Sequence, residues 1–409
     1  MSRVLFLGFP LYAHSIQTFP LVKELVAKGE DVLYYSSSRF EREIKRTGAH
    51  FREYPEVTNS ASREIVLQPH LLAKMTRQIL LREMDAMAEF SPEYIIYDRT
   101  ALWGPFLKKR WEIPAICTHS SIVMDKAVFK LQPTFQRLKT YLRKVHLLPN
   151  LVSSLRAMLM MHQVAKFYNF HGTIDPPQNA DLILVNTSEQ FQPPLQTKDE
   201  RYRFVGWFPT HAFRMENTPF DWQAIQKEKL VYISLGTTFN QDVLFFQRCF
   251  QALKHLDAQI LISTGRGINP QELGPPPANF ILTAWVPQLE ILERASVFIT
   301  QGGSSSICES LFFGVPVIVI PQWAEQYAMG YWVEKLNIGL QLENGVVTIQ
   351  KLKEAVEVVL SDQMFCNNCR ELGDTLREAG GVQRAINEIL TFKEKQGIAN
   401  SPRIEAHHA

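Results

Sequence analysis

Short apolar runs alternate with longer amphipathic runs along this 409-residue sequence. RVLFLGF at residues 3–9 and DVLYYSS at 31–37 are nearly continuous apolar runs, and FPLVKELVAKG at 19–29 between them has helical spacing. Parallel strands that are buried on both faces need such uninterrupted apolar runs, and helices connect them. The alternation therefore predicts an α/β fold with doubly wound parallel sheets.

The pattern occurs twice, with a break between the two halves. YIIYD at 94–98 and PAICTHS at 114–120 continue the first set. The second set starts with LVYISLGTT at 230–238 and continues with apolar runs at 259–265, 279–285, 296–303 and 315–321. Residues 205–229 are rich in proline and aromatic residues without a clear period, which is typical of a linker.

The two sets predict two Rossmann-like domains that face each other across a cleft. We expect an N-terminal domain over 1–207, a linker over 208–228, a second domain over 229–380, and a C-terminal helix and tail over 381–409. Ligands of such domains bind outside the carboxyl ends of the strands. Both domains should therefore contribute to one site in the cleft.

The composition argues against several other classes of protein. Lys plus Arg number 43 against 41 for Asp plus Glu, so no overall charge indicates a nucleic-acid partner. The first apolar run ends in a turn with glycine and proline and reads as a strand, not a signal peptide, and no stretch reaches the ~18 apolar residues of a membrane span. Five scattered cysteines fit the reducing cytoplasm, which is the predicted location. Cys366 and Cys369 form a CxxC in a helical pattern without a second ligand pair, so we expect no metal there.

The turn TQGGSSSICESL at residues 300–311 lies between an apolar strand and an amphipathic helix. Ser304 or Ser305 is placed to cap that helix. Free amides at a helix N-terminus, the helix dipole, and glycines that let an oxyanion approach the backbone together make an anion site. The alternative interpretation is a plain tight turn that binds no ligand. The residues on either side of the turn are needed to distinguish the two interpretations.

The flanking residues favour a ligand site. Trp285 ends a predicted strand at the cleft, where its ring offers a flat platform for a base, and Gln288 lies one turn away as an amide partner. Downstream, PQWAEQ places Glu325 and Gln326 after another strand, where an acid and an amide can bind hydroxyl groups.

The stretch 285–326 resembles the donor-binding signature of the family 1 UDP-glycosyltransferases of GT-B fold, which include plant enzymes and bacterial macrolide and flavonoid glucosyltransferases. The match covers WVPQ, GGSSS, Glu309, GVP at 314–316 and PQWAEQ, and ISLGTTF resembles the first loop of the same domain. The resemblance implies that Trp285 stacks on uracil, that Gln288 and Glu309 bind the base and ribose, that the turn binds the pyrophosphate, and that the PQWAEQ pair binds the hexose. The donor-binding residues that it implies are Gly236, Thr237, Trp285, Val286, Gln288, Gln301, Gly302, Gly303, Ser304, Ser305, Ser306, Glu309, Glu325 and Gln326.

His14 and Asp98 are the predicted catalytic residues. His14 follows the first strand, at the position of the family's general base, and Asp98 ends another strand of the same sheet and matches the family's partner aspartate. An attacking hydroxyl must lose its proton, and an imidazole that titrates near pH 7 suits that task. Taken without His14, Asp98 would read as a helix N-cap.

The reaction that the resemblance implies is transfer of a hexose, glucose first of all, from UDP to a hydroxyl of a small hydrophobic acceptor such as a flavonoid or macrolide, with inversion at the anomeric carbon. The chain contains no Asp-x-Asp pair, so we expect backbone amides and the helix dipole, not a bound metal, to stabilise the leaving pyrophosphate.

The sequence departs from the family pattern in three places. Gln301 stands where most members have His, Ala13 and Gln17 stand where many bacterial members have Gly and Pro, and Ser305 stands where Asn is usual. Gln301 can still donate a hydrogen bond, but without a charge, so we expect weaker donor binding or slower turnover. A degenerate GT-B protein that only binds nucleotide sugar is the main alternative, and another GT-B reaction, such as epimerisation or transfer to a lipid-linked acceptor, is a third.

Residues 126–174 carry eight Lys and Arg residues and no Asp or Glu, interleaved with aromatic residues and methionines. In the family this region covers the acceptor pocket, and its composition suits a flat, apolar acceptor. The segment reads either as amphipathic helices with basic solvent faces or as a weak docking surface for an anionic membrane.

Overall fold

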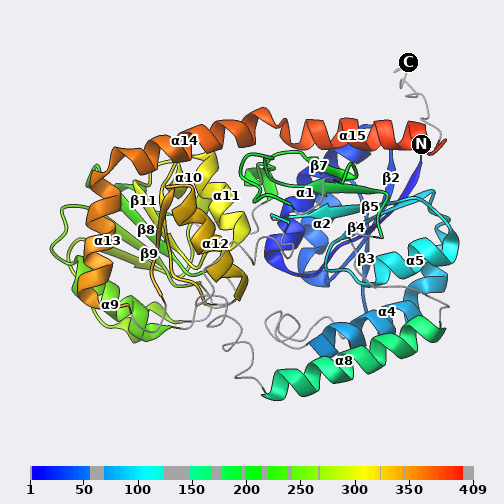
Figure 1. Ribbon diagram of the computed structural model, residues 1–409, viewed down its shortest axis with the longest axis horizontal. Coiled ribbons are helices and arrows are strands. Elements are labelled where there is room, and N and C mark those ends of the chain that lie inside the picture. Colours follow the sequence, from blue (N-terminus) through cyan, green and yellow to red (C-terminus); the bar gives the residue numbers. More distant parts are fainter. Residues whose placement is uncertain are drawn as a thin grey trace.

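The computed structural model describes residues 2–55, 69–120, 122–123, 148–167, 177, 179–195, 199–213, 220–236, 242–265, 268–322, 324–343 and 347–398. These residues form two lobes, each built around one parallel sheet with helices on both faces (Figure 1). This confirms the predicted pair of doubly wound domains.

The first sheet has seven strands in the order β3-β2-β1-β4-β5-β6-β7. Its strands are β1 (Arg3–Leu7), β2 (Asp31–Ser36), β3 (His50–Glu53), β4 (Tyr94–Asp98), β5 (Ala115–His119), β6 (Leu182–Val185) and β7 (Tyr202–Phe204). The strand order reverses between β1 and β4, which pair in parallel with Val4 opposite Tyr94. Ligands of doubly wound folds bind at such a switch point.

The second sheet has six strands in the order β10-β9-β8-β11-β12-β13. Its strands are β8 (Leu230–Ser234), β9 (Gln259–Ser263), β10 (Phe280–Thr283), β11 (Val297–Thr300), β12 (Val317–Val319) and β13 (Gly339–Gln341). Here the order reverses between β8 and β11, with Ser234 opposite Thr300. The two switch points face the same space between the lobes.

Helices follow the strands in both lobes. The first lobe contains α1 (Tyr12–Ala27), α2 (Glu41–Arg46), α4 (Pro69–Glu89), α5 (Trp103–Trp111) and α8 (Leu148–Phe167). The second contains α9 (Val243–Leu253), α10 (Gln288–Leu292), α11 (Ser304–Phe312), α12 (Ala324–Lys335), α13 (Ile349–Ser361) and α14 (Gln363–Glu378). Short 3₁₀ turns are η1 (Ser38–Phe40), η3 (His211–Phe213), η4 (Trp222–Ala224) and η6 (Pro270–Leu273).

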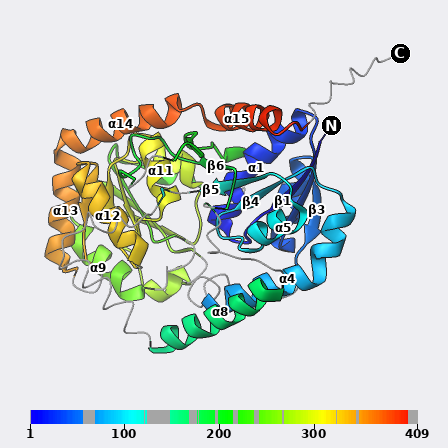
Figure 2. The same ribbon diagram turned by 45° about the vertical axis from the view of Figure 1, so that its right-hand side comes forward.

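The last helix, α15 (Gly381–Lys395), returns to the first lobe, so that α14 and α15 together span both lobes (Figures 1 and 2). Ile386 and Phe392 lie in the same apolar cluster as Val4 and Phe6 of β1. The ammonium group of Lys393 on α15 pairs with the Glu30 carboxylate before β2, and both side chains are buried. The tail of the chain therefore closes the core of the N-terminal lobe; the domain bounds themselves remain a prediction.

A second set of contacts joins the lobes next to the cleft. The Trp332 indole on α12 donates to the Phe191 carbonyl at 2.8 Å, and the hydroxyls of Ser188 and Thr375 lie 2.8 Å apart. These bonds connect the segment after β6 to α12 and α14, and they hold the two lobes together.

Much of the basic segment 126–174 lies outside the described residues, which leave out 124–147 and 168–176. The part that is described is α8, which packs against α4. None of the helices in the described ranges combines the length and hydropathy that a membrane span requires. Docking of this segment on a membrane surface stays a prediction.

Candidate active site

A cavity of about 930 Å³ lies between the two lobes and is lined by both. Its lining includes residues that follow β1, β4 and β5 in the first lobe. In the second lobe it includes residues that follow β8, β9, β10, β11 and β12. Twelve of the sixteen predicted site residues line it: His14, Gly236, Trp285, Val286, Gln288, Gln301, Gly303, Ser304, Ser305, Ser306, Glu309 and Glu325. Asp98, Gly302 and Gln326 lie behind this wall, and Thr237 falls outside the described residues.

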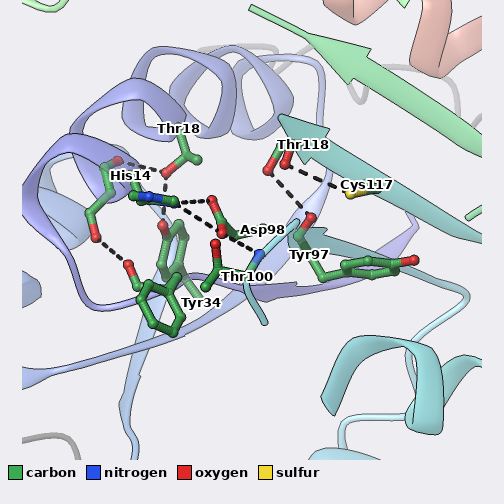
Figure 3. A network of polar contacts seen from close by, with 10 residues as sticks. His14, Thr18, Tyr34, Tyr97, Asp98, Thr100, Cys117 and Thr118 are labelled. Carbon is green, nitrogen blue, oxygen red and sulfur yellow. Dashed lines mark hydrogen bonds and ion pairs between the residues drawn. The ribbon is translucent and has the colours of Figure 1, made fainter. Parts of the chain in front are cut away.

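The His14 ring lies against the Asp98 carboxylate (Figure 3). Its Nδ1 is 2.9 Å from Oδ2 and 3.1 Å from Oδ1 of Asp98. His14 lies in the first turn of α1 and is 24% exposed, whereas the Asp98 side chain is 2% exposed. Helix α1 begins at Tyr12, earlier than the apolar pattern at 19–29 indicates, so the helix itself positions the His14 ring over the end of β4.

Asp98 is held in its ionised form. Burial raises the pKa of its carboxyl, but the charge and hydrogen bond of His14 and the hydrogen bonds from Thr100 outweigh burial and lower that pKa below its usual value. The Thr100 amide donates to Oδ1 at 2.8 Å. Because an ionised carboxylate only accepts hydrogen bonds, Nδ1 of His14 carries the hydrogen, and the lone pair of the neutral ring is on Nε2. The pair can therefore accept a proton from a ligand in the cavity.

Helix α11 points its N-terminus at the cavity. Its first residue is Ser304, and the N-cap is Gly303 in an extended conformation without a side-chain cap. The prediction that Ser304 or Ser305 caps the helix is wrong, because both serines already lie in its first turn. Without a side-chain cap, the amides of that first turn remain for a ligand, and the helix dipole favours an anion.

Two glycines allow close packing around this turn, one against β12 and one in the first loop of the second lobe. Gly302 has φ +87°, and a β-carbon there would lie 2.6 Å from Cγ1 of Val319. Gly236 after β8 has φ +74°, and a β-carbon there would collide with the Gln301 amide. The Gln301 oxygen Oε1 is buried without a partner in the described structure. Gln301 therefore fills the space between the two loops with a neutral amide.

The predicted base and ribose residues are linked to one another. Gln288 begins α10; its Oε1 accepts from the Tyr232 hydroxyl at 3.0 Å, and its Nε2 donates to the Glu309 carboxylate at 2.5 Å. Trp285 follows β10 by two residues, and the Tyr12 ring meets it edge to face with centroids 6.1 Å apart. The first lobe thus contacts the expected base platform through Tyr12.

Glu325 and Gln326 differ in their surroundings although they are adjacent on α12. Glu325 is exposed and lines the cavity. Gln326 is buried, and its Oε1 accepts from the Gln322 amide at 2.7 Å. Gln326 therefore stabilises the loop that precedes α12.

Tyr12, Arg99 and Tyr232 are among the cavity residues that sequence reasoning did not identify. Arg99 directly follows Asp98, so its place at a strand end was a signal that could have been used. Tyr232 alternates with apolar residues inside β8, and nothing in the sequence pattern distinguishes it from a core residue.

Comparisons with known proteins identify the family of this chain. Residues 178–378 match the family model "UDP-glucoronosyl and UDP-glucosyl transferase". The "Uncharacterized UDP-glucosyltransferase YojK" of Bacillus subtilis is 30% identical over 98% of this chain and 100% of its own length. The demethyllactenocin mycarosyltransferase of Streptomyces fradiae is 27% identical over 95% of this chain and 86% of its own.

Solved structures of glycosyltransferases share the fold. The glycosyltransferase of kitacinnamycin superposes with a TM-score of 0.79 at 26% identity, covering 95% of this chain and 98% of its own. The calicheamicin glycosyltransferase CalG4 gives a TM-score of 0.76 at 22% identity over 97% and 99% of the two chains. Because YojK matches nearly the whole chain at 30% identity, the chain belongs to the UDP-glucuronosyl and UDP-glucosyl transferase family, and it is a glycosyltransferase of GT-B fold.

Proposed function

We propose that this enzyme transfers a hexose, with glucose as the first candidate, from a UDP-sugar to a hydroxyl group of a small hydrophobic natural product. The observation that carries the proposal is His14 on one wall of the cavity, paired with the buried Asp98 behind it, with the N-terminus of α11 on the opposite lobe. Relatives named for macrolide sugar transfer support the acceptor class.

In this proposal the donor lies along the second lobe. Trp285 stacks on the base, the Gln288–Glu309 pair binds the base and ribose, and the first turn of α11 holds the pyrophosphate. Glu325 accepts hydrogen bonds from the hexose hydroxyls. Tyr232 orients the Gln288 amide, so this part of the site is arranged before the donor binds.

The chemistry is a single displacement. Nε2 of His14 accepts the proton of the acceptor hydroxyl while its oxygen forms a bond to the anomeric carbon. The bond from that carbon to the β-phosphate oxygen breaks, and UDP leaves with the electron pair. Attack from the face opposite UDP inverts the anomeric centre, and Asp98 stabilises the imidazolium that forms.

The test is product analysis with UDP-glucose and a panel of flavonoids and macrolides, by mass spectrometry and by NMR of the anomeric configuration. We expect an inverted glucoside from the wild type and at least a 100-fold lower rate from His14→Gln, with UDP binding unchanged. If UDP raises the melting temperature while no glycoside forms with any acceptor, the enzyme proposal fails and the binding-only alternative is favoured. A retained anomeric configuration would refute the displacement.

A further inference from the structure

Arg99 is a cation on the first-lobe wall of the cavity. It follows Asp98 directly, and its backbone amide donates to the Thr118 carbonyl at 3.0 Å, which continues the pairing of β4 with β5. Its backbone is therefore fixed next to the His14–Asp98 pair. The residue is partly buried, in contrast to the exposed Lys109 and Arg110 at the end of α5.

The Arg99 side chain has no hydrogen-bond or ion-pair partner among the residues that the structure describes. The adjacent Asp98 carboxylate is occupied by His14 and Thr100 instead. Two other partly buried arginines of this lobe are paired, Arg201 with Asp199 at 2.7 Å and Arg203 with Glu388 at 3.0 Å. Arg99 is thus a guanidinium group beside the cavity that lacks a counter-ion from the described chain.

The cavity wall divides by charge between the lobes. The described first-lobe lining is largely apolar, including Phe9, Leu11 and Leu72, and it contains no Asp or Glu. Among the described residues, the carboxylates that line the cavity belong to the second lobe: Glu290, Glu309 and Glu325. The described donor half is therefore acidic, and the half expected to hold the acceptor carries Arg99 in a wall that also has apolar residues.

A partly buried guanidinium in an apolar wall favours a carboxylate ligand, because its planar donors match both carboxylate oxygens and little water competes. We propose that Arg99 binds a carboxylate of the acceptor, which makes apolar hydroxy acids, such as phenolic acids, the preferred acceptor class. In this arrangement the acceptor's carboxylate binds the Arg99 guanidinium while its hydroxyl group contacts His14. This inference rests on the proposed function and adds the acceptor's charge to it.

The experiment compares 4-hydroxycinnamic acid with its methyl ester, which differ in charge at one end, using UDP-glucose as donor. We expect the wild type to prefer the acid by about tenfold or more in kcat/KM, as a charge-assisted hydrogen-bonded pair provides. In Arg99→Gln the preference should fall to about one because use of the acid is lost, while UDP is still bound with the wild-type affinity. Arg99→Lys should retain part of the preference, and Arg110→Gln is the matched surface control that should retain all of it.

Equal use of acid and ester by the wild type would overturn the inference, as would a preference that survives in Arg99→Gln. A loss of UDP affinity in Arg99→Gln would assign Arg99 to the donor instead and would also overturn it. Calorimetry of the acid with UDP-saturated enzyme separates this inference from the proposed function. If the acid binds in a way that depends on Arg99 but no sugar is transferred, only the proposed function is refuted. If sugar is transferred to the ester alone, only the inference about Arg99 is refuted.

Discussion

The side-chain amide of Gln301 covers the α-carbon of Gly236, so closely that a β-carbon at position 236 would collide with its nitrogen. The contact joins the loop after β8 to the loop after β11, the two loops at the switch point of the second sheet. Gln301 also leaves its buried Oε1 without a partner in the described structure. The end of the cavity proposed for the phosphates is thus closed by a neutral amide.

Replacing Gln301 with histidine should strengthen donor binding. An imidazolium donates a charge-assisted hydrogen bond to phosphate, about 1 kcal/mol stronger than that of an amide, which is about fivefold in affinity. The gain should be larger at pH 6 than at pH 8, because imidazole is protonated only near and below pH ~6.5. Calorimetry with UDP measures it, and Gln301→Met, which removes both polar atoms, is the comparison. An unchanged affinity at pH 6 would mean that position 301 does not reach the phosphates.

Gly236→Ala should weaken UDP binding by about tenfold or more. Its φ of +74° strains any L-residue by about 1 kcal/mol, and the added methyl group must displace the Gln301 amide. Gly397→Ala is the control, since Gly397 has φ +69° and no atom within 4 Å of the added carbon. The control should lose a similar amount of stability and bind UDP normally. Equal UDP affinities in the two variants would show that the loop contact is irrelevant to the donor.

The sequence predicted the parts of this molecule that depend on local pattern. Continuous apolar runs identify buried parallel strands, and residues at strand carboxyl ends meet at one edge, so His14 and Asp98 could be paired before the structure was known. Contacts between distant segments could not be predicted in this way. The hydrogen bond from Tyr232 to Gln288 and the packing of Lys393 against Glu30 join segments 56 and 363 residues apart, and no periodicity encodes them.

The prediction of a serine cap on α11 failed for a different reason. Serine is a favoured N-cap, so the pattern GGSSS predicts a serine cap. The chain instead places the extended Gly303 at the cap, and this moves all three serines into the first turn. A ligand anion can take the place of a side-chain cap, and sequence propensity does not include a ligand.

Asp98→Asn should destabilise the protein in a pH-dependent way. The pKa of Asp98 is lowered in the folded state, so its ionised form stabilises the fold above the unfolded-state pKa of about 3.9, and this stabilisation is lost as the pH falls through the lower folded pKa. We expect the free energy of unfolding to fall by about 2 kcal/mol at pH 7, because the hydrogen bonds to His14 and Thr100 are weakened. The difference between variant and wild type should be smaller at pH 3. Urea unfolding at both pH values measures it. A difference that grows on acidification would contradict the sign.

The buried pair of Lys393 and Glu30 predicts how α15 is held. Lys393 is 1% exposed and lies 5.8 Å from the centre of the Tyr94 ring, and Glu30 is 6% exposed, so removing one partner leaves the other charge buried. Lys393→Met should therefore cost about 3–5 kcal/mol of unfolding free energy, whereas replacing a whole buried pair by uncharged groups is often nearly neutral.

The double variant Lys393→Met with Glu30→Gln should accordingly be more stable than Lys393→Met alone, by melting temperature and by denaturant unfolding. Lys351, an exposed lysine in the first turn of α13, gives the control Lys351→Met, which should change stability by less than about 0.5 kcal/mol. If the double variant is as unstable as the sum of the two single changes, the pair does not act as a unit. Recovery in the double variant would mean that α15 is fixed mainly by Ile386, Ile389 and Phe392 in the apolar cluster, and that the ion pair selects its position without adding much net stability.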